Sequence, residues 1–344
     1  MKKVAVIFGG KSTEYEVSLK SARAVIDALD HEKYQILQIC ITEKGEWRLL
    51  SGDYVIDTSS ERWLRASTQI QPVISETSKG LYDRDQMEFH VPDLIFPVIH
   101  GQQGEDGILQ GVLEMMEIPY IGCDITSSAI CFNKKLTHQL AGVNGVQATP
   151  SITLTKPEFP EAFIDQNGYP VFVKPLRGGS SIGISKAQTK EELISAIEEA
   201  FRYDRIITIE KAVEGIEVGC GILEQNGERI IGSVDEIELQ SGFFDYHEKY
   251  HLEQAEIHQP ARVADEVKRQ VAEMAERLFV AFGCQDLARI DFFIDRTGAI
   301  YLNEINTMPG FTGQSRFPRM FAELGIDYAA LIEILLQNHL RSEE

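Results

Sequence analysis

The feature that most constrains the fold is a pair of β-rich runs, Leu287 to Ile294 and Ala299 to Asn306. The residues between them, Asp295 to Gly298, form turns readily, so the two runs predict an antiparallel hairpin. Side chains alternate between the two faces of a strand. The pattern therefore predicts two sets of side chains that each share a face: Arg289, Asp291 and Phe293 on the first strand, and Leu302, Glu304 and Asn306 on the second.

If the turn is centred between Arg296 and Thr297 or one residue later, the register places Asp291 opposite Glu304 and Arg289 near Asn306. Two opposed carboxylates destabilise a strand pair by up to about 1 kcal/mol, and a bound divalent cation would reverse that sign. Carboxylate and amide oxygens suit Mg²⁺ or Mn²⁺ and do not suit zinc. The hairpin thus predicts a metal site made by Asp291, Glu304 and Asn306. The alternative is a solvated polar strand face.

Composition limits the partners and the compartment. The net charge of −20 at pH 7 opposes binding to nucleic acid or to an anionic membrane, so neither is an expected partner. The five cysteines are widely spaced and include no C-x-x-C, which is typical of reduced thiols in a cytoplasmic protein. The segment MKKVAVIFGG is interpreted as a first strand and not as a signal peptide.

The amino-terminal part has the pattern of an α/β domain, assigned to residues 1–125. An apolar strand at Val4 to Phe8, a helix at Ser18 to Leu29 and a strand at Tyr34 to Ile41 predict a βαβ unit. The segment Trp47 to Glu88 predicts irregular structure or short strands. A strand at Val91 to Ile99 leads into the glycine-rich sequence that begins at His100, and such strand ends are where α/β sheets place ligand sites. A short strand is expected at 119–121.

The middle domain, assigned to residues 126–213, carries a phosphate-binding pattern. A single helix is expected from Ser127 to Leu140, and it includes Lys134. A strand at Val171 to Pro175 presents Lys174. The loop that follows, LRGGSSIG, contains Ser180 and Ser181, and its glycines free backbone N–H groups that can hold a phosphate. No G-K-[ST] opens a helix here, so this is not a Walker loop. A merely flexible hairpin is the alternative.

The last domain, assigned to residues 214–344, combines the hairpin with a predicted lid. The loop from Gln240 to Tyr250 is rich in aromatic residues without helical spacing, which indicates a segment that orders over a ligand. Long helices are expected from Val263 to Phe282 and from Tyr328 to Leu340.

Six motifs in this order resemble the D-alanine:D-alanine ligase family of ATP-grasp enzymes: GGKSTEYEVSLKSA, HGQQGEDGILQG, KPLRGGSSIG, FFDYHEKY, ARIDFF and NEINTMPGFTGQS. The resemblance covers essentially the whole chain. The segments EYEVSLKSA, SSAICFNK and LNEINTMPGFTGQSRFP are similar to the vancomycin-resistance branch that makes D-alanine:D-serine. The resemblance implies a three-domain ATP-grasp fold with a Rossmann-like amino-terminal domain. It also implies ligation through a D-alanyl phosphate, with ATP and two Mg²⁺ or Mn²⁺ as cofactors.

The resemblance also implies roles for individual residues. It assigns catalysis to Glu14, Ser180, Tyr250, Arg289 and the Gly310 N–H, with Arg289 interpreted as an oxyanion donor rather than as a salt-bridge partner of Asp291. It assigns substrate binding to His100, Glu105, Lys249, Ser315 and Arg316. It assigns the nucleotide to Lys134, Lys174, Ser181, Glu210, Lys211, Val213 and Glu217. A homodimer is the assembly that the family suggests.

Two departures bear on the acceptor substrate. Tyr15 follows Glu14 where many relatives have His or Arg, and Arg316 follows Ser315 where D-alanine:D-alanine enzymes often have Leu or Met. Arg316 makes the second subsite polar, which favours D-serine over D-alanine, while Tyr250 argues against D-lactate. D-alanine as the acceptor is the first alternative. A non-catalytic ATP-binding regulatory module is a remote one, and a nicotinamide dehydrogenase lacks its glycine fingerprint.

Overall fold

The computed structural model describes residues 1–50, 56, 61–177, 183–239 and 255–340. Its amino-terminal elements are β1 (Lys2–Gly9), α1 (Tyr15–Ala28), β2 (Tyr34–Ile41), β3 (Trp47–Leu50), the 3₁₀ helix η1 (Glu61–Ala66), β4 (Ser67–Ile74), β5 (Lys79–Asp83), β6 (Glu88–His90), β7 (Leu94–Val98) and α2 (Ile108–Met116).

The middle of the chain forms α3 (Ile125–Phe132), α4 (Lys134–Val143), β8 (Ser151–Leu154), α5 (Glu161–Asn167), β9 (Val171–Pro175), β10 (Ser185–Ala187), α6 (Lys190–Ala200) and β11 (Ile207–Lys211). The remaining elements are β12 (Gly215–Gln225), β13 (Glu228–Ile231), β14 (Asp235–Leu239), β15 (Ala255–His258), α8 (Asp265–Ala281), β16 (Leu287–Asp295), β17 (Ile300–Asn306), α9 (Arg316–Ala322) and α10 (Tyr328–Leu340).

The first sheet has the strand order β6-β5-β4-β3-β2-β1-β7, with β1 parallel to both β2 and β7. The continuous apolar run of β1 is buried on both faces, as expected for a central parallel strand. Helix α1 covers one face and α2 the other. The expected strand at 119–121 is reduced to one bridge between Tyr120 and Ile95. The segment from Trp47 to Glu88 supplies short antiparallel strands, as one of its two interpretations predicts.

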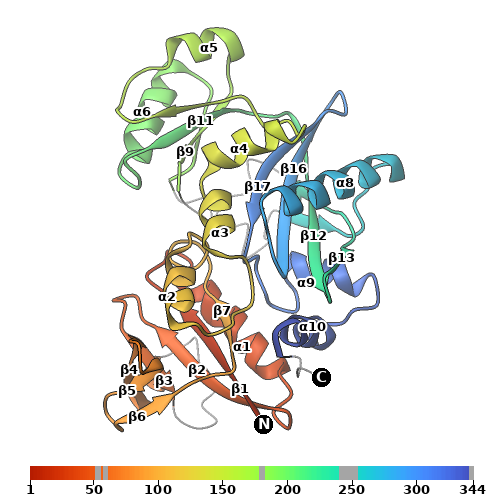
Figure 1. Ribbon diagram of the computed structural model, residues 1–344. Helices are drawn as coiled ribbons and strands as arrows, with labels where there is room; N and C mark the ends of the chain where they lie inside the picture. The colour runs from red at the N-terminus through yellow and green to blue at the C-terminus, as the bar shows by residue number, and fades with distance from the viewer. Residues whose placement is uncertain (51–55, 57–60, 178–182, 240–254, 341–344) are drawn as a thin grey trace.

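The carboxyl-terminal helices pack on the amino-terminal sheet, so the two ends of the chain share one core. Figure 1 shows α10 beside α1 at the lower end of the molecule. Val6 and Phe8 of β1 belong to the same buried cluster as Leu331 and Leu335 of α10. The Tyr34 hydroxyl also donates to Glu333 Oε1 at 3.1 Å. The loop between β17 and α9 belongs to the same core, because the Phe311 ring lies 5.6 Å from the Phe96 ring of β7.

A pair of helices, α3 and α4, replaces the single helix expected from Ser127 to Leu140. Asn133 has extended backbone and separates the two helices. The Asn133 side chain accepts the Leu136 N–H at 3.2 Å. Asn is favoured at a helix N-cap because its side chain satisfies a donor that lacks an intrahelical partner. Thr137 Oγ1 donates to Ile130 O at 2.8 Å across the junction. The break matters for the site because α4 begins at Lys134.

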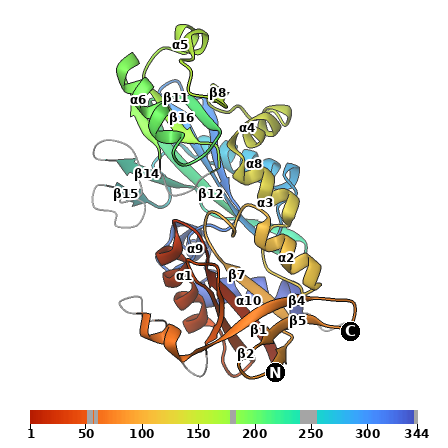
Figure 2. The same ribbon diagram turned by 90° about the vertical axis from the view of Figure 1, so that its left-hand side faces the viewer.

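The two other sheets hold the rest of the predicted machinery. The order β10-β9-β11-β8 forms a four-stranded sheet whose core includes Leu193 of α6 and Phe163 of α5. The third sheet has the order β15-β14-β12-β16-β17, with β13 paired to β12, and α8 packs on its buried face. Figure 2 shows β12 and β16 of this sheet running from the four-stranded sheet at the top toward the amino-terminal sheet below. No helix in the described part of the chain is long and apolar enough to cross a membrane.

Candidate active site

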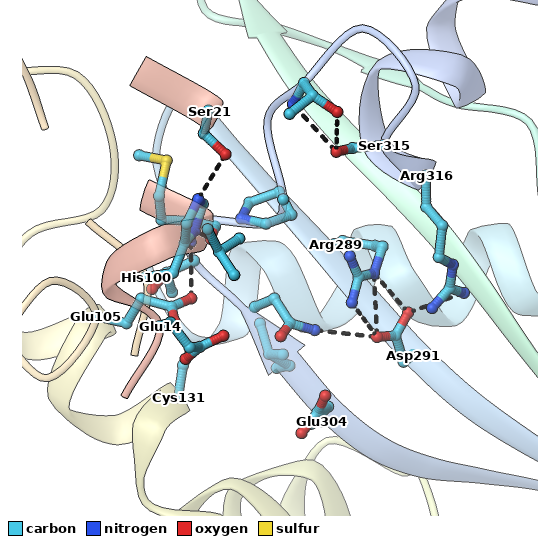
Figure 3. Close-up of a pocket in the computed structure, with 18 of the residues that line it drawn as sticks. Glu14, Ser21, His100, Glu105, Cys131, Arg289, Asp291, Glu304, Ser315 and Arg316 are labelled. Carbon is cyan, nitrogen blue, oxygen red and sulfur yellow. Dashed lines mark hydrogen bonds and ion pairs between the residues drawn. The ribbon is translucent and has the colours of Figure 1, made fainter. Parts of the chain in front are cut away.

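A cavity of about 300 Å³ lies where the amino-terminal sheet, α4 and the hairpin meet. Its volume is at the lower end of the range for small-molecule sites. Most of the predicted site residues line it: Glu14, His100, Glu105, Lys134, Glu217, Arg289, Asp291, Glu304, Asn306, Gly310, Ser315 and Arg316. Figure 3 shows two groups, with Glu14, His100 and Glu105 on one side and Arg289, Asp291 and Arg316 on the other.

The hairpin has the predicted register. Asp291 pairs with Glu304, and Arg289 pairs with Asn306. The Asn306 Nδ2 donates to Asp291 Oδ2 at 3.0 Å. The Oδ1 of Asn306 therefore points away from this hydrogen bond. Opposed carboxylates and an amide oxygen on one cavity wall are a set of hard ligands that fits a divalent cation bound through oxygen. This local arrangement supports the predicted metal ligands.

The expectation that Leu302 shares a face with Glu304 is wrong. The pairing shifts between Asp291 and Phe292, because Phe292 pairs with Leu302 and leaves Asn303 as an extra residue in β17. Such a bulge reverses the alternation of side chains. Leu302 is consequently in the buried cluster under α8, together with Ile305, while Glu304 lines the cavity. The bulge is thus what places Glu304 and Asn306 at the site.

Arg289 is a salt-bridge partner of Asp291, contrary to the interpretation made from sequence. Its Nη2 lies 2.7 Å from Asp291 Oδ2, and its Nε lies 2.9 Å from Oδ1. Burial by itself raises the pKa of Asp291, but the Arg289 and Arg316 guanidinium groups outweigh it, so the pKa of Asp291 is lowered. Asp291 is therefore ionised before any cation binds. The oxyanion role of Arg289 stays a prediction.

Arg316 lies in a buried ion-pair network, and Asp235 is the member that sequence reasoning missed. Arg316 Nε and Nη2 each lie 2.7 Å from an Asp235 carboxylate oxygen. Its Nη2 is 3.3 Å from Asp291 Oδ1, and its Nη1 is 3.8 Å from Glu217 Oε1. Burial lowers the pKa of Arg316, but Asp235 and Asp291 reverse this and raise it. Glu217, predicted to hold adenosine, is here a partner of Arg316.

Gly219 makes room for this network. A glycine at this position, inside an apolar strand, was the sequence signal that another group approaches the strand closely. It lies in β12, paired with Asp235 on one side and Asp291 on the other. A Cβ on Gly219 would come within 2.6 Å of Asp291 Oδ1. A glycine inside an apolar strand often marks such a close approach of another group. The pattern VGCGIL therefore contained this information, although it did not identify the partner.

Glu14 sits at the start of α1, where a glycine again allows the approach. The helix begins at Tyr15, earlier than the expected Ser18. Ser12 Oγ accepts the Glu14 N–H at 3.1 Å and donates to His100 O at 2.7 Å, so the two glycine-rich loops are joined. Gly101 has a φ of +71°, and a Cβ there would collide with the Glu14 carboxylate. The structure thus directs Glu14 into the cavity.

His100 and Glu105 both bind the backbone of Met308, next to the metal-site strand. His100 Nδ1–H donates to Met308 O at 2.9 Å, so its Nε2 accepts from Ser21 Oγ, also at 2.9 Å. Glu105 accepts the Met308 N–H at 3.1 Å and the Gly101 N–H at 2.7 Å. Burial and the nearby Glu14 raise the pKa of Glu105 to about 8, while burial lowers the pKa of His100.

Four of the predicted nucleotide residues lie on the middle sheet or directly after its strand β11: Lys174, Glu210, Lys211 and Val213. Lys174 Nζ is 2.7 Å from Glu210 Oε2, and the two side chains are 11% and 4% exposed. Burial raises the pKa of Glu210, but Lys174 and His138 outweigh this effect, so the pKa is lowered. Lys211 Nζ donates to Tyr169 O at 3.0 Å. Val213 follows β11, and Lys134 begins α4 and lines the cavity.

The other predicted residues fall in two groups. Ser315 precedes α9, and its Oγ accepts the Thr312 N–H at 3.0 Å, which tightens the loop that carries Gly310. Four predicted residues, Ser180, Ser181, Lys249 and Tyr250, lie outside the described residues. Their roles, and the lid, stay predictions from sequence.

The chain matches two family models. One, described as "D-ala D-ala ligase N-terminus", matches residues 3–123, and the other, "D-ala D-ala ligase C-terminus", matches residues 143–337. Among curated proteins, the "Vancomycin C-type resistance protein VanC1" of Enterococcus gallinarum is 44% identical over 98% of both chains. A "D-alanine--D-alanine ligase" of Caldicellulosiruptor bescii is 40% identical over 97% of this chain and 94% of its own.

Solved structures show the same likeness in three dimensions. The "VanG D-Ala:D-Ser Ligase from Enterococcus faecalis" has a TM-score of 0.89 and 41% identity, over 98% of this chain and 99% of that one. The "D-alanyl-alanine synthetase A from Vibrio cholerae" has a TM-score of 0.85 and 30% identity, over 98% of both chains.

Proposed function

Since the chain belongs to the D-alanine:D-alanine ligase family, we propose that it uses ATP to join D-alanine to D-serine. Its fold is the three-domain ATP-grasp fold with a Rossmann-like amino-terminal domain. Domain boundaries at 125/126 and 213/214 are supported by the sheets, because each of the three sheets lies within one of these segments.

The proposal of D-serine as the acceptor rests on one observation: Arg316 lines the cavity beside Ser315 and makes that part of the cavity polar. Arg316 lines the cavity and is 7% exposed, and Asp235 and Glu217 accompany it. A site that offers a hydrogen-bonding group to a substrate hydroxyl disfavours the analogue without one, since its own buried polar group would then lose a partner. Leu or Met at this position would give no such contact.

The residues present fit the nucleotide and two Mg²⁺ or Mn²⁺. Lys134 and Lys174 would hold phosphates, with Glu210, Lys211, Val213 and Glu217 near the adenosine, and Asp291, Glu304 and Asn306 would hold the cations. The nucleotide supplies the phosphoryl group that turns the D-alanine carboxylate into D-alanyl phosphate, whose carbonyl the acceptor amine attacks as phosphate leaves. The cations offset the negative charge that gathers among these phosphates and carboxylates.

The chain's own residues bind and orient the reactants. Glu14 would receive the ammonium of D-alanine, and His100 would lie near its carboxylate, held in place by Ser21 and Met308. Arg289 and the Gly310 N–H line the same cavity and would stabilise the oxyanion. Removing one such donor typically costs about 3 to 4 kcal/mol of transition-state stabilisation. Ser315 would meet the carboxylate of the acceptor.

The proposal also covers the assembly and the compartment. We infer a homodimer, since α2 and α3 expose large apolar side chains, among them Ile108, Met115 and Ile125. Large apolar patches on a surface often mark contacts between proteins. Light scattering coupled to size-exclusion chromatography tests this, and a monomer at all concentrations would contradict it. A cytoplasmic location is proposed from the five free, buried cysteines.

The decisive experiment measures phosphate release with ATP and D-alanine alone, and then with D-serine added, and identifies the product by mass. We expect D-alanyl-D-serine, with a higher kcat/KM for D-serine than for D-alanine as acceptor. A product containing only D-alanine would establish the alternative acceptor. ATP binding without ADP release in the presence of both amino acids would establish the non-catalytic module.

A further inference from the structure

The bulge at Asn303 is held from outside its sheet. Among the described residues, β17 is the edge strand of that sheet, and its outer side forms only an isolated bridge, between Leu302 and Ala148. On the bulge, Leu302 N–H donates to Gln147 O at 2.7 Å. The next carbonyl, Asn303 O, lies 3.3 Å from His138 Nε2. An edge strand with an extra residue depends on such outside contacts for its conformation, because the regular ladder is interrupted there.

His138 reaches this carbonyl from α4. Because a carbonyl oxygen only accepts, Nε2 carries the hydrogen, and Nδ1 of the neutral ring is then the acceptor. Ser151 Oγ lies 3.5 Å from Nδ1 and is its donor. Ser151 belongs to β8 and pairs with Glu210 of β11. The ring therefore spans from the nucleotide-side sheet to the strand that carries Glu304.

The helix adds a second connection. Lys134 and His138 are four residues apart on α4, which places them on the same helical face. Lys134 lines the cavity, and α4 packs along β17. The same turn of helix thus presents a lysine to the proposed phosphate site and an imidazole to the bulge beside the proposed metal ligands.

We propose that His138 is a positioning residue that holds the Asn303 bulge and thereby directs Glu304 and Asn306 toward the cation. This role rests on the metal site of the proposed function. Without the Nε2–H contact, the extra residue can move along β17, and regular alternation would turn Glu304 away from Asp291. Groups that orient metal ligands typically change metal affinity or activity by about 10- to 100-fold when they are removed.

The test measures Mn²⁺ binding in the presence of ADP, with the free Mn²⁺ signal in electron paramagnetic resonance, so that no turnover is needed. His138→Leu removes both contacts at similar volume, and we expect about tenfold weaker Mn²⁺ binding. His138→Gln places an amide N–H near the position of Nε2, and we expect it to restore most of the affinity. His138→Asn can replace only Nδ1, so it should bind as weakly as the leucine variant.

Two controls separate this role from general packing. Ser151→Ala removes the contact on the other side of the ring, and we expect Mn²⁺ affinity to stay at the wild-type value. Thermal unfolding of each variant shows whether it is folded. If the leucine variant does not fold, the comparison of Mn²⁺ affinity between His138→Gln and His138→Asn tests the positioning role. Equal affinity in the Gln and Asn variants, or wild-type affinity in the leucine variant, overturns the positioning role. Absence of Mn²⁺ binding by the wild type would overturn the metal site itself.

Discussion

Arg316 and Asp235 form a fork-to-fork ion pair across 81 residues of sequence. Nε and Nη2 each bond a different carboxylate oxygen at 2.7 Å, and the two side chains are 8% and 0% exposed. A bidentate pair of this kind fixes direction as well as distance. The guanidinium is therefore held in one orientation. In the proposed acceptor subsite, this fixed orientation is a condition for selecting between acceptors that differ by one hydroxyl.

Arg316→Leu should lower the preference for D-serine over D-alanine. The hydroxyl loses its polar neighbour, so the ratio of the two kcat/KM values should fall by about tenfold or more. The variant also leaves Asp235 buried without its partner, and breaking a buried pair in this way typically costs about 3 to 5 kcal/mol of unfolding free energy. Steady-state kinetics with each acceptor and urea unfolding measure the two effects.

The double variant Arg316→Leu with Asp235→Asn separates these effects. Removing the uncompensated carboxylate should return much of the lost stability, while the acceptor ratio should stay low. An acceptor ratio that the single variant leaves unchanged would remove the argument for D-serine.

Gly219→Ala should disturb the same network from the opposite side. The added methyl would lie 2.6 Å from Asp291 Oδ1 and closer still to Arg316 Nη2. Crowding of a packed site typically costs about 1 to 3 kcal/mol, so we expect lower stability and a lower kcat/KM for D-serine. Gly142→Ala is the matched control, because a Cβ there meets nothing within 4 Å. In helix α4 it should stabilise by up to about 1 kcal/mol. Equal stability and equal kcat/KM for D-serine in the two variants would contradict crowding at Gly219.

Glu304→Gln should weaken metal binding without harming the metal-free fold. The variant removes a carboxylate opposite Asp291, so the unfolding free energy without metal should stay the same or rise by up to about 1 kcal/mol. Calorimetric titration of Mn²⁺ in the presence of ADP should show at least about a tenfold loss of affinity. Glu273→Gln on α8, where the side chain is 62% exposed, is the control. Wild-type Mn²⁺ affinity in Glu304→Gln would exclude this carboxylate as a ligand.

The raised pKa of Glu105 should make the free energy of unfolding depend on pH. Its pKa rises from the usual 4.5 to about 8 through burial and Glu14, so the folded protein holds this proton more tightly than the unfolded chain does. The resulting stabilisation is full below pH 4.5 and is lost as the pH rises toward about 8. Glu105→Gln does not titrate. The unfolding free energy of the wild type minus that of the variant should therefore fall between about pH 5 and about pH 8.5 in urea unfolding. A difference that stays constant over this range would contradict the raised pKa.

The hairpin shows what local sequence can predict. The turn residues and the two-residue period of a strand predicted the hairpin and the pair Asp291 with Glu304, and the structure has this pair. Near the turn, however, Phe292 pairs with Leu302, so the pair of Asp291 with Glu304 forms only because the bulge shifts the register by one residue. The bulge at Asn303 did not follow from the turn residues or the strand period. Its position depends on the outer edge of β17, where His138 and Gln147 make contacts across more than 150 residues.

The sequence by itself determined the family, the presence of the hairpin and the chemical type of most cavity residues, because motifs and strand periods are local. Only the tertiary structure decided that Arg289 pairs with Asp291, that Asp235 and Gly219 accommodate Arg316, and that Glu105 binds the Met308 N–H. These contacts join elements that fold in different parts of the chain. Their pairing depends on how the three sheets pack against one another, and no local pattern of residues specifies that packing.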